Sequence, residues 1–163
     1  MKISLLSKSE SYRLIEVIKK KWPSQFILPK VKTIKVYEVE QGKRILKYDN
    51  ITAIQISDNI ILPFLGESHL LRYFPCVVVD MGAVKFICNG AKILRPGITK
   101  FDSFGVGDIV TVKDLNFSKT IAAGIAIQDS ETASRNPKGY VIDNLHYISD
   151  KFWEAYKEID NKF

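Results

Sequence analysis

The chain has 163 residues, of which 46% are hydrophobic and 26% charged, and its net charge is +6. This composition is typical of a globular protein and argues against a largely disordered or collagen-like chain. No apolar run is long enough to span a membrane, and the first residues lack the apolar core of a secretory signal. We therefore expect a cytoplasmic protein of one or two domains, with no membrane partner.

The first part of the chain predicts a helix followed by a small antiparallel sheet. Ser7 and Glu10 have capping-box spacing, and apolar residues then recur at helical intervals until Pro23, which ends the helix. From residue 33 the hydrophobic period changes to two, which predicts a hairpin over residues 33–48. The other elements predicted here are strands at 51–56 and 60–65 and a short helix within 66–73.

The second part predicts short strands separated by glycine turns, a pattern typical of a small barrel. The predicted strands are residues 76–79, 109–112, 121–127 and 140–142, with a helix over 83–88, a helical turn near 130–134 and a final helix from about Asp150. Asn89-Gly90 is expected to end the first of these helices in left-handed geometry, and Pro96-Gly97 has the sequence of a type II turn.

The few nucleophiles and metal-binding side chains are expected to be structural. Cys76 lies on a predicted strand and Cys88 at the end of an apolar helix, where thiols are usually reduced and inert. His146 is expected to be a hydrogen-bonded junction residue, and Asp80 and Asp108 adjoin glycines as turn or cap acceptors do. We therefore expect no enzyme activity, no catalytic residues, no metal and no cofactor.

The positive charge is unevenly distributed. Residues 1–72 hold 13 Lys or Arg against 7 Asp or Glu, whereas residues 73–163 hold 11 of each. Within the second part, residues 80–100 contain four basic side chains against one acid. Basic regions attract polyanions because each neutralised phosphate releases counterions, so nucleic acid is the first partner class to consider, although many basic proteins bind none.

Several motifs in the second part resemble a PUA domain. Residues 77–98 read VVVDMGAVKFICNGAKILRPGI and contain D-x-G-A-x-K-F followed by G-A-x-x-x-x-P-G-I. G-D-x-V follows at residues 107–110, and a glycine interrupts the penultimate strand. With the lysine-rich first part, the layout is similar to the malignant T-cell-amplified sequence family and its yeast and archaeal relatives.

The resemblance implies an α+β protein of two domains: a small α/β pre-PUA domain over residues 1–72 and a PUA pseudo-β-barrel with a C-terminal helix over residues 73–163. It also implies binding of structured RNA (tRNA or rRNA), action on the small ribosomal subunit and, in eukaryotes, a protein partner called density-regulated protein. No catalytic domain is attached, so an activity of its own is not implied.

A candidate RNA-binding site lies between residues 82 and 98. Gly90 and Gly97 lack the Cβ that would keep a phosphate backbone away, although turn chemistry alone also accounts for both. Lys85 and Arg95 fall in the one basic segment of an otherwise neutral domain, and Arg95 could form a forked pair with phosphate oxygens. The complete candidate set is Gly82, Lys85, Asn89, Gly90, Lys92, Arg95, Pro96, Gly97 and Ile98, with Lys19, Lys20 and Lys21 as a further basic surface that the helix dipole also explains.

Exposed aromatic rings near this segment would matter, since unpaired bases stack on them. Phe86 is the obvious candidate, but we expect it in the core because its short helix must bury one side. The roles of Phe101, Phe104, Phe117 and Tyr140 stay open.

The function predicted from sequence is a non-catalytic RNA-binding protein of the translation apparatus. Its expected partners are tRNA or ribosomal RNA, a ribosomal subunit, and a protein partner through the N-terminal domain. The alternatives are a ribosome-biogenesis factor, an RNA-binding subunit of an RNA-modification complex and, from another class, a protein-interaction adaptor.

Overall fold

The computed structural model describes residues 1–26, 28, 30 and 33–160, and the chain divides into two compact units. Residues 1–73 form the first unit together with the C-terminal helix, and residues 74–150 form the second. The sequence assigned the C-terminal helix to the second domain. The structure groups it with the first, because its apolar side chains pack on the sheet of that unit.

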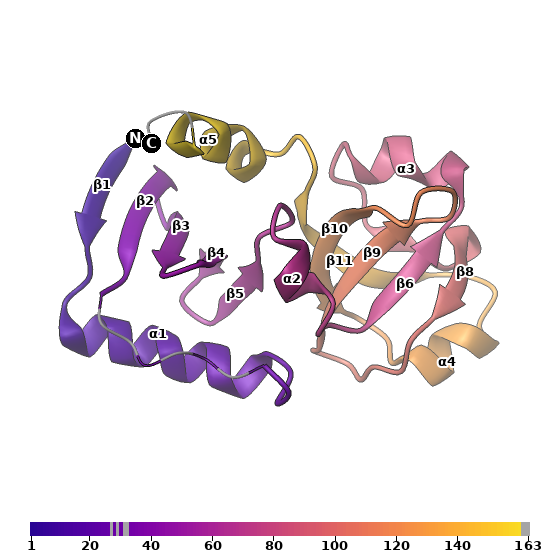
Figure 1. Ribbon diagram of the computed structural model, residues 1–163. Helices are drawn as coiled ribbons and strands as arrows, with labels where there is room; N and C mark the ends of the chain where they lie inside the picture. Colours follow the sequence, from indigo (N-terminus) through magenta and orange to yellow (C-terminus); the bar gives the residue numbers. More distant parts are fainter. Residues whose placement is uncertain (27, 29, 31–32, 161–163) are drawn as a thin grey trace. The chain divides into compact units, whose positions relative to one another are not determined.

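The first unit is a five-stranded antiparallel sheet in the order β1-β2-β3-β4-β5, with α1 on one face and α5 on the other (Figure 1). Its elements are β1 (Lys2–Leu5), α1 (Lys8–Lys21), β2 (Lys35–Glu40), β3 (Lys43–Tyr48), β4 (Ile51–Ser57), β5 (Ile60–Pro63), α2 (Ser68–Leu71) and α5 (Lys151–Asp160). Alternate residues of the central strands are buried on opposite faces, since each face is covered by a helix.

The predicted start and end of the first helix are confirmed. The Oγ of Ser7 accepts the backbone N–H of Glu10 at 3.2 Å, and α1 ends just before Trp22 and Pro23. The predicted hairpin is also confirmed as β2 and β3. The strand β1 was not predicted, because all four of its residues are exposed and no burial alternation marks it.

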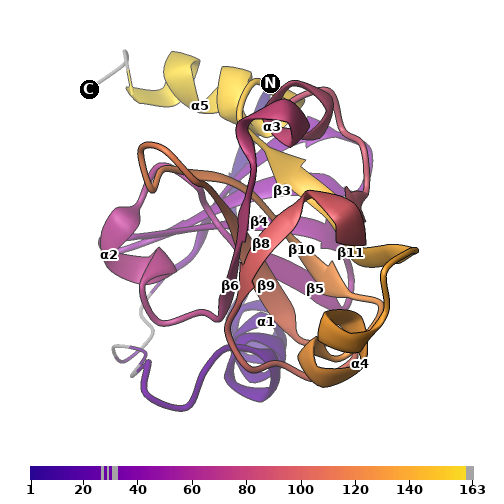
Figure 2. The same cartoon turned by 90° about the vertical axis from the view of Figure 1, so that its right-hand side faces the viewer.

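The second unit is a six-stranded sheet in the order β7-β11-β10-β9-β6-β8, in which only β6 and β9 pair in parallel. Its elements are β6 (Cys76–Val79), α3 (Met81–Ile87), β7 (Ile93–Leu94), the 3-10 turn η1 (Arg95–Gly97), β8 (Ile98–Phe101), β9 (Ile109–Asp114), β10 (Thr120–Ala126), α4 (Ser130–Arg135) and β11 (Tyr140–Tyr147). The edge strands β7 and β8 are joined directly by η1, which closes the sheet into a pseudo-barrel with α3 and α4 at opposite ends (Figure 2).

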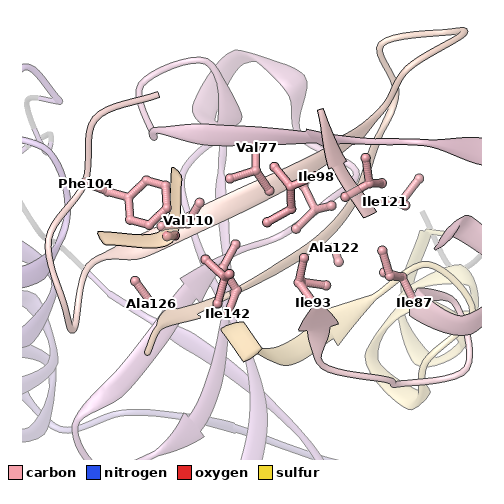
Figure 3. Packing of buried hydrophobic residues seen from close by; sticks show 14 residues of the cluster. Val77, Ile87, Ile93, Ile98, Phe104, Val110, Ile121, Ala122, Ala126 and Ile142 are labelled. Carbon is pink, nitrogen blue, oxygen red and sulfur yellow. The ribbon is translucent and has the colours of Figure 1, made fainter. Parts of the chain in front are cut away.

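Branched apolar side chains from the barrel strands fill its interior. Val77, Ile98, Val110 and Ile142 are among them, and none is more than 5% exposed (Figure 3). Burial of this kind supplies most of the driving force for folding, at about 25 cal/mol per Å² of apolar surface. The rigid barrel therefore gives the loops at its ends a fixed frame.

Three details of the second unit differ from the sequence prediction. Residues 95–97 form a 3-10 turn, and the φ of Gly97 is not positive, so the predicted type II turn is wrong. The strand β8 was not predicted because it begins immediately after that turn, with no loop residue to mark where it starts. The strand β11 is longer than predicted and runs to Tyr147, since its pairing with β10 continues past a register shift.

Candidate nucleic-acid interface

A groove of about 280 Å³ opens on the second unit between α3 and the segment that runs from β7 into η1. Its lining is mostly apolar and comprises Val79, Asp80, Ala83, Phe86, Ile87, Ala91, Lys92, Ile93, Leu94, Pro96 and Gly97. Grooves of this kind, with few charged groups at their edge, are typical of ligand sites.

Side-chain hydrogen bonds fix both ends of the helix that forms one wall. The Oδ1 of Asp80 accepts the N–H of Ala83 at 3.0 Å, as the sequence predicted for a cap. At the other end, the amide of Asn144 donates to the carbonyls of Ile87 and Ala91, each at 3.0 Å. The wall is therefore preorganised by the barrel.

Exposed rings lie at the groove and beside it. Phe86 is 64% exposed, so its predicted core position is wrong; the core contacts of α3 come from Ile87 and from half-buried Ala83 and Val84. Leu94 and Tyr140 are partners across β7 and β11 and are 50% and 54% exposed. The Nζ of Lys92 lies 5.3 Å from the centre of the Tyr140 ring, within range of a cation–π contact.

The charge around the groove is positive. Lys85 and Lys92 are exposed, and the acid in the lining, Asp80, uses one oxygen to cap α3. Exposed lysines beside exposed rings offer charge to phosphates and flat surfaces to bases, the two contacts that single-stranded nucleic acid requires.

The guanidinium of Arg95 is hydrogen-bonded to backbone carbonyls of the protein itself. Its Nε donates to the carbonyl of Ala133 at 2.6 Å, and its Nη1 donates to the carbonyl of Ile98 at 3.0 Å. The guanidinium also lies over the ring of Phe101, 4.9 Å from its centre. With a longer bond of 3.5 Å from its Nη2 to the carbonyl of Ser134, Arg95 thus donates to two carbonyls at the C-terminal end of α4, where a cation also complements the helix dipole.

The two glycines of the sequence argument are explained by packing. Gly90 has a φ of +92°, and a Cβ there would lie 3.1 Å from the hydroxyl of Tyr147. A Cβ on Gly97 would lie 3.2 Å from the Cβ of Ala83, so Gly97 allows η1 to approach α3 closely. Both missing side chains therefore face protein atoms.

The nine candidate residues thus fall into three groups. Lys92, Pro96 and Gly97 line the groove; Gly82, Lys85 and Asn89 are exposed on α3 or just after it; Gly90, Arg95 and Ile98 support the fold. Ile98 is only 5% exposed and belongs to the barrel core. Leu94 was missed, because a two-residue strand carries no periodicity from which its outward face could be read.

The further basic surface lies on the first unit. Lys19, Lys20 and Lys21 are exposed on the last turn of α1, and the Nζ of Lys19 lies 3.8 Å from a carboxylate oxygen of Glu16. Their position at the C-terminal end of a helix agrees with the dipole argument made from sequence.

The two cysteines and the histidine of the second unit are structural. Burial raises the pKa of the Cys88 thiol, and burial together with Asp102 raises that of Cys76, so neither is an activated thiolate. His146 is fully buried and bonded to Asp150 through its Nδ1 at 2.7 Å, as expected for a junction residue.

Two negative findings apply to the described part of the chain. Its His, Cys, Asp and Glu side chains form no group of three or more that could hold a metal ion. Among its helices, none is both long and apolar enough to cross a membrane.

Comparison with known proteins agrees with this geometry. The model of the PUA domain family matches residues 75–148. An uncharacterised protein of Methanocaldococcus jannaschii is 37% identical over 131 residues, which cover 78% of this chain and 79% of that protein. Human malignant T-cell-amplified sequence 2 is 28% identical over 81% of this chain and 76% of its own length. Translation machinery-associated protein 20 of Saccharomyces cerevisiae is 26% identical over 78% and 75%.

A solved structure extends the likeness to nearly the whole chain. The crystal structure of a hypothetical protein from Pyrococcus horikoshii superposes with a TM-score of 0.78 at 27% identity, and the match covers 94% of this chain and 99% of that chain. The fold and the groove thus define a two-unit PUA-domain protein. The chain belongs to the family that includes the malignant T-cell-amplified sequence proteins and translation machinery-associated protein 20.

Proposed function

We propose that this protein is a non-catalytic RNA-binding factor of the translation apparatus, which holds tRNA or small-subunit ribosomal RNA in the groove beside α3. The observation that carries the proposal is the groove itself, where the exposed ring of Phe86 and the exposed ammonium of Lys92 share one apolar lining. Bases stack on exposed rings, and lysines neutralise phosphates.

The preorganised walls support this function over a purely structural role for the segment. A stable PUA barrel needs Ile87, Ile93 and Ile98 inside, but it gains nothing from leaving Phe86 and Leu94 in water. Capture of RNA by a groove that is already formed avoids the entropy cost of ordering the loops. The link to translation comes from the family, one of whose members is named as translation machinery-associated.

A binding titration against tRNA tests the proposal. We expect tighter binding to tRNA that has its single-stranded 3′ end than to tRNA lacking it, and affinity that falls as salt rises. The combined substitution of Lys85→Glu and Lys92→Glu should weaken binding by about 1–3 kcal/mol. Affinity that is indifferent to RNA, to salt and to these substitutions would overturn the proposal.

A matched control comes from α4. Arg135 on α4 is exposed and pairs with Glu131, outside the groove lining. Arg135→Glu changes the net charge as much as each single lysine substitution and half as much as the combined variant. Compared with Lys85→Glu and Lys92→Glu measured singly, it separates a general charge effect from a local one. We expect it to leave the affinity for tRNA nearly unchanged.

A further inference from the structure

The hairpin between β9 and β10 presents a phenylalanine that does not serve the core. Phe117 is 77% exposed, more than any other large apolar side chain in the described residues, and Leu115 two positions earlier is 50% exposed. A ring left in water forgoes the free energy of burial that a core position would provide. A ligand that covers the ring would supply this free energy on binding.

The turn that carries this ring is fixed by a buried carboxylate. The N–H of Phe117 donates to the Oδ1 of Asp114 at 2.5 Å, and Asp114 is only 4% exposed. The N–H of Asp114 in turn donates to the carbonyl of Lys119 at 3.1 Å, which closes the hairpin. The backbone below the ring is thus ordered before any ligand arrives, which reduces the entropy cost of binding.

The hairpin tip lies at the end of the barrel where the groove opens. Val79, which lines the groove, accepts a hydrogen bond from the N–H of Leu115 at 3.0 Å, and Val79 pairs with Asp114 in the parallel register of β6 and β9. Residues of α3 and of β10, the second strand of this hairpin, lie close together. The positive charge of Lys119 acts on the Cys88 thiol at the end of α3, where it partly offsets the rise in the thiol pKa caused by burial.

The charge around the tip indicates what binds there. Lys119 on the hairpin and Lys85 on α3 are both exposed, while the carboxylate of Asp114 is buried and bonded. An exposed aromatic ring two residues from an exposed lysine matches an unpaired base next to a phosphate better than it matches an apolar protein surface.

We propose that Phe117 is a second stacking platform, which takes an unpaired base of the RNA whose neighbouring nucleotides occupy the groove beside α3. This inference rests on the proposed function. It assigns to the β9–β10 hairpin a direct role in RNA binding and extends the RNA path from the groove across α3 to Lys119.

The test uses the full chain and two RNA probes: a hairpin RNA with a 3′ single-stranded tail of about six nucleotides, and the same hairpin without the tail. Phe117→Ala should weaken binding of the tailed RNA about fivefold or more, because it removes the stack. Phe117→Leu keeps an apolar side chain without an aromatic face and should lose a similar amount. Phe117→Trp should retain the affinity.

The tryptophan variant provides a direct readout. Its fluorescence should be quenched by the tailed RNA, beyond the signal of Trp22 and Trp153 measured in the wild-type protein. Val106→Ala is the matched control, since Val106 is 67% exposed in the loop that precedes β9, whereas Phe117 follows the other end of that strand. It should not change the affinity.

The outcomes separate this inference from the proposed function. Unchanged affinity in Phe117→Ala, with binding still weakened by Lys85→Glu and Lys92→Glu, overturns the stacking role and leaves the proposed function standing. Full affinity in Phe117→Leu also overturns it, and indicates an apolar docking contact. If the wild-type protein binds neither probe, the proposed function fails and this inference fails with it.

Discussion

Carbonyl oxygens surround the guanidinium of Arg95, so its main contribution is to stability. The bond to Ala133 connects η1 to α4, and the bond to Ile98 connects it to the start of β8. We expect Arg95→Ala to lower the free energy of unfolding by about 1–3 kcal/mol, because it leaves these partly buried carbonyls without their donor. Denaturant titration measures this change.

Lys85 provides the comparison for Arg95, since it is exposed on α3. Lys85→Ala removes the same charge and should leave the free energy of unfolding within about 0.5 kcal/mol of wild type, while weakening the binding of RNA. If Lys85→Ala destabilised the protein as much as Arg95→Ala, this division of roles would be wrong.

The local role of some groove residues could be predicted from the sequence, but which side chains face the solvent could not. Asp80 was predicted as a cap because its position before a short helix is a local signal, and the structure confirms the bond to Ala83. The helix α3 has only seven residues, so the sequence pattern does not distinguish which of Val84, Phe86 and Ile87 face the core. Only the packing of the helix on the barrel decides that Phe86 faces solvent.

The strand β10 contains a glycine at the point where its pairing with β11 shifts register. A Cβ on Gly124 would lie 1.9 Å from the carbonyl oxygen of Asp143, which is a backbone atom and cannot move freely. We expect Gly124→Ala to lower the free energy of unfolding by about 1–3 kcal/mol or more through overpacking. Thermal or denaturant unfolding measures it.

Gly105 is the control for this substitution. A Cβ there would have its nearest neighbour at 3.7 Å, an ordinary contact, and the φ of Gly105 is not positive. Gly105→Ala should therefore change the free energy of unfolding by no more than about 0.5 kcal/mol. Equal effects at both glycines would contradict the account of the close strand approach.

The helix α5 belongs to the first unit through its apolar face. Phe152 is 3% exposed and packs in one cluster with Tyr37, Ile45 and Ile54. We expect Phe152→Ala to cost about 3–5 kcal/mol and to reduce hydrogen-exchange protection mainly in β2–β4. Glu158→Ala, at an exposed position of the same helix, should have little effect.

Loss of protection in β9–β11 rather than in β2–β4 would contradict this assignment. The sequence alone could not assign α5 to the first unit, because the apolar face of an amphipathic helix after the last barrel strand could pack on either sheet. The elements themselves were predictable where caps, turns and periodicity are local, as in α1 and the β2–β3 hairpin. The exposed strand β1 and the two-residue strand β7 carry no such signal.

On the scale of the whole molecule, the PUA barrel was predictable because its motifs are fold signals. D-x-G-A-x-K-F contains the cap of α3, and G-A-x-x-x-x-P-G-I contains the left-handed Gly90 and the close contact of Gly97 with Ala83. These residues therefore identify the family through the barrel that they build. The groove lies between the same elements but depends on outward-facing side chains, which the motifs do not specify.

Amide chemical-shift mapping of the 15N-labelled full chain, titrated with an oligonucleotide that represents the single-stranded 3′ end of tRNA, tests the central claim most directly. The account predicts the largest shifts at Phe86, Lys92 and Leu94, with smaller ones at the β9–β10 hairpin. Saturable binding with these amides unmoved, or shifts confined to the first unit, would contradict it.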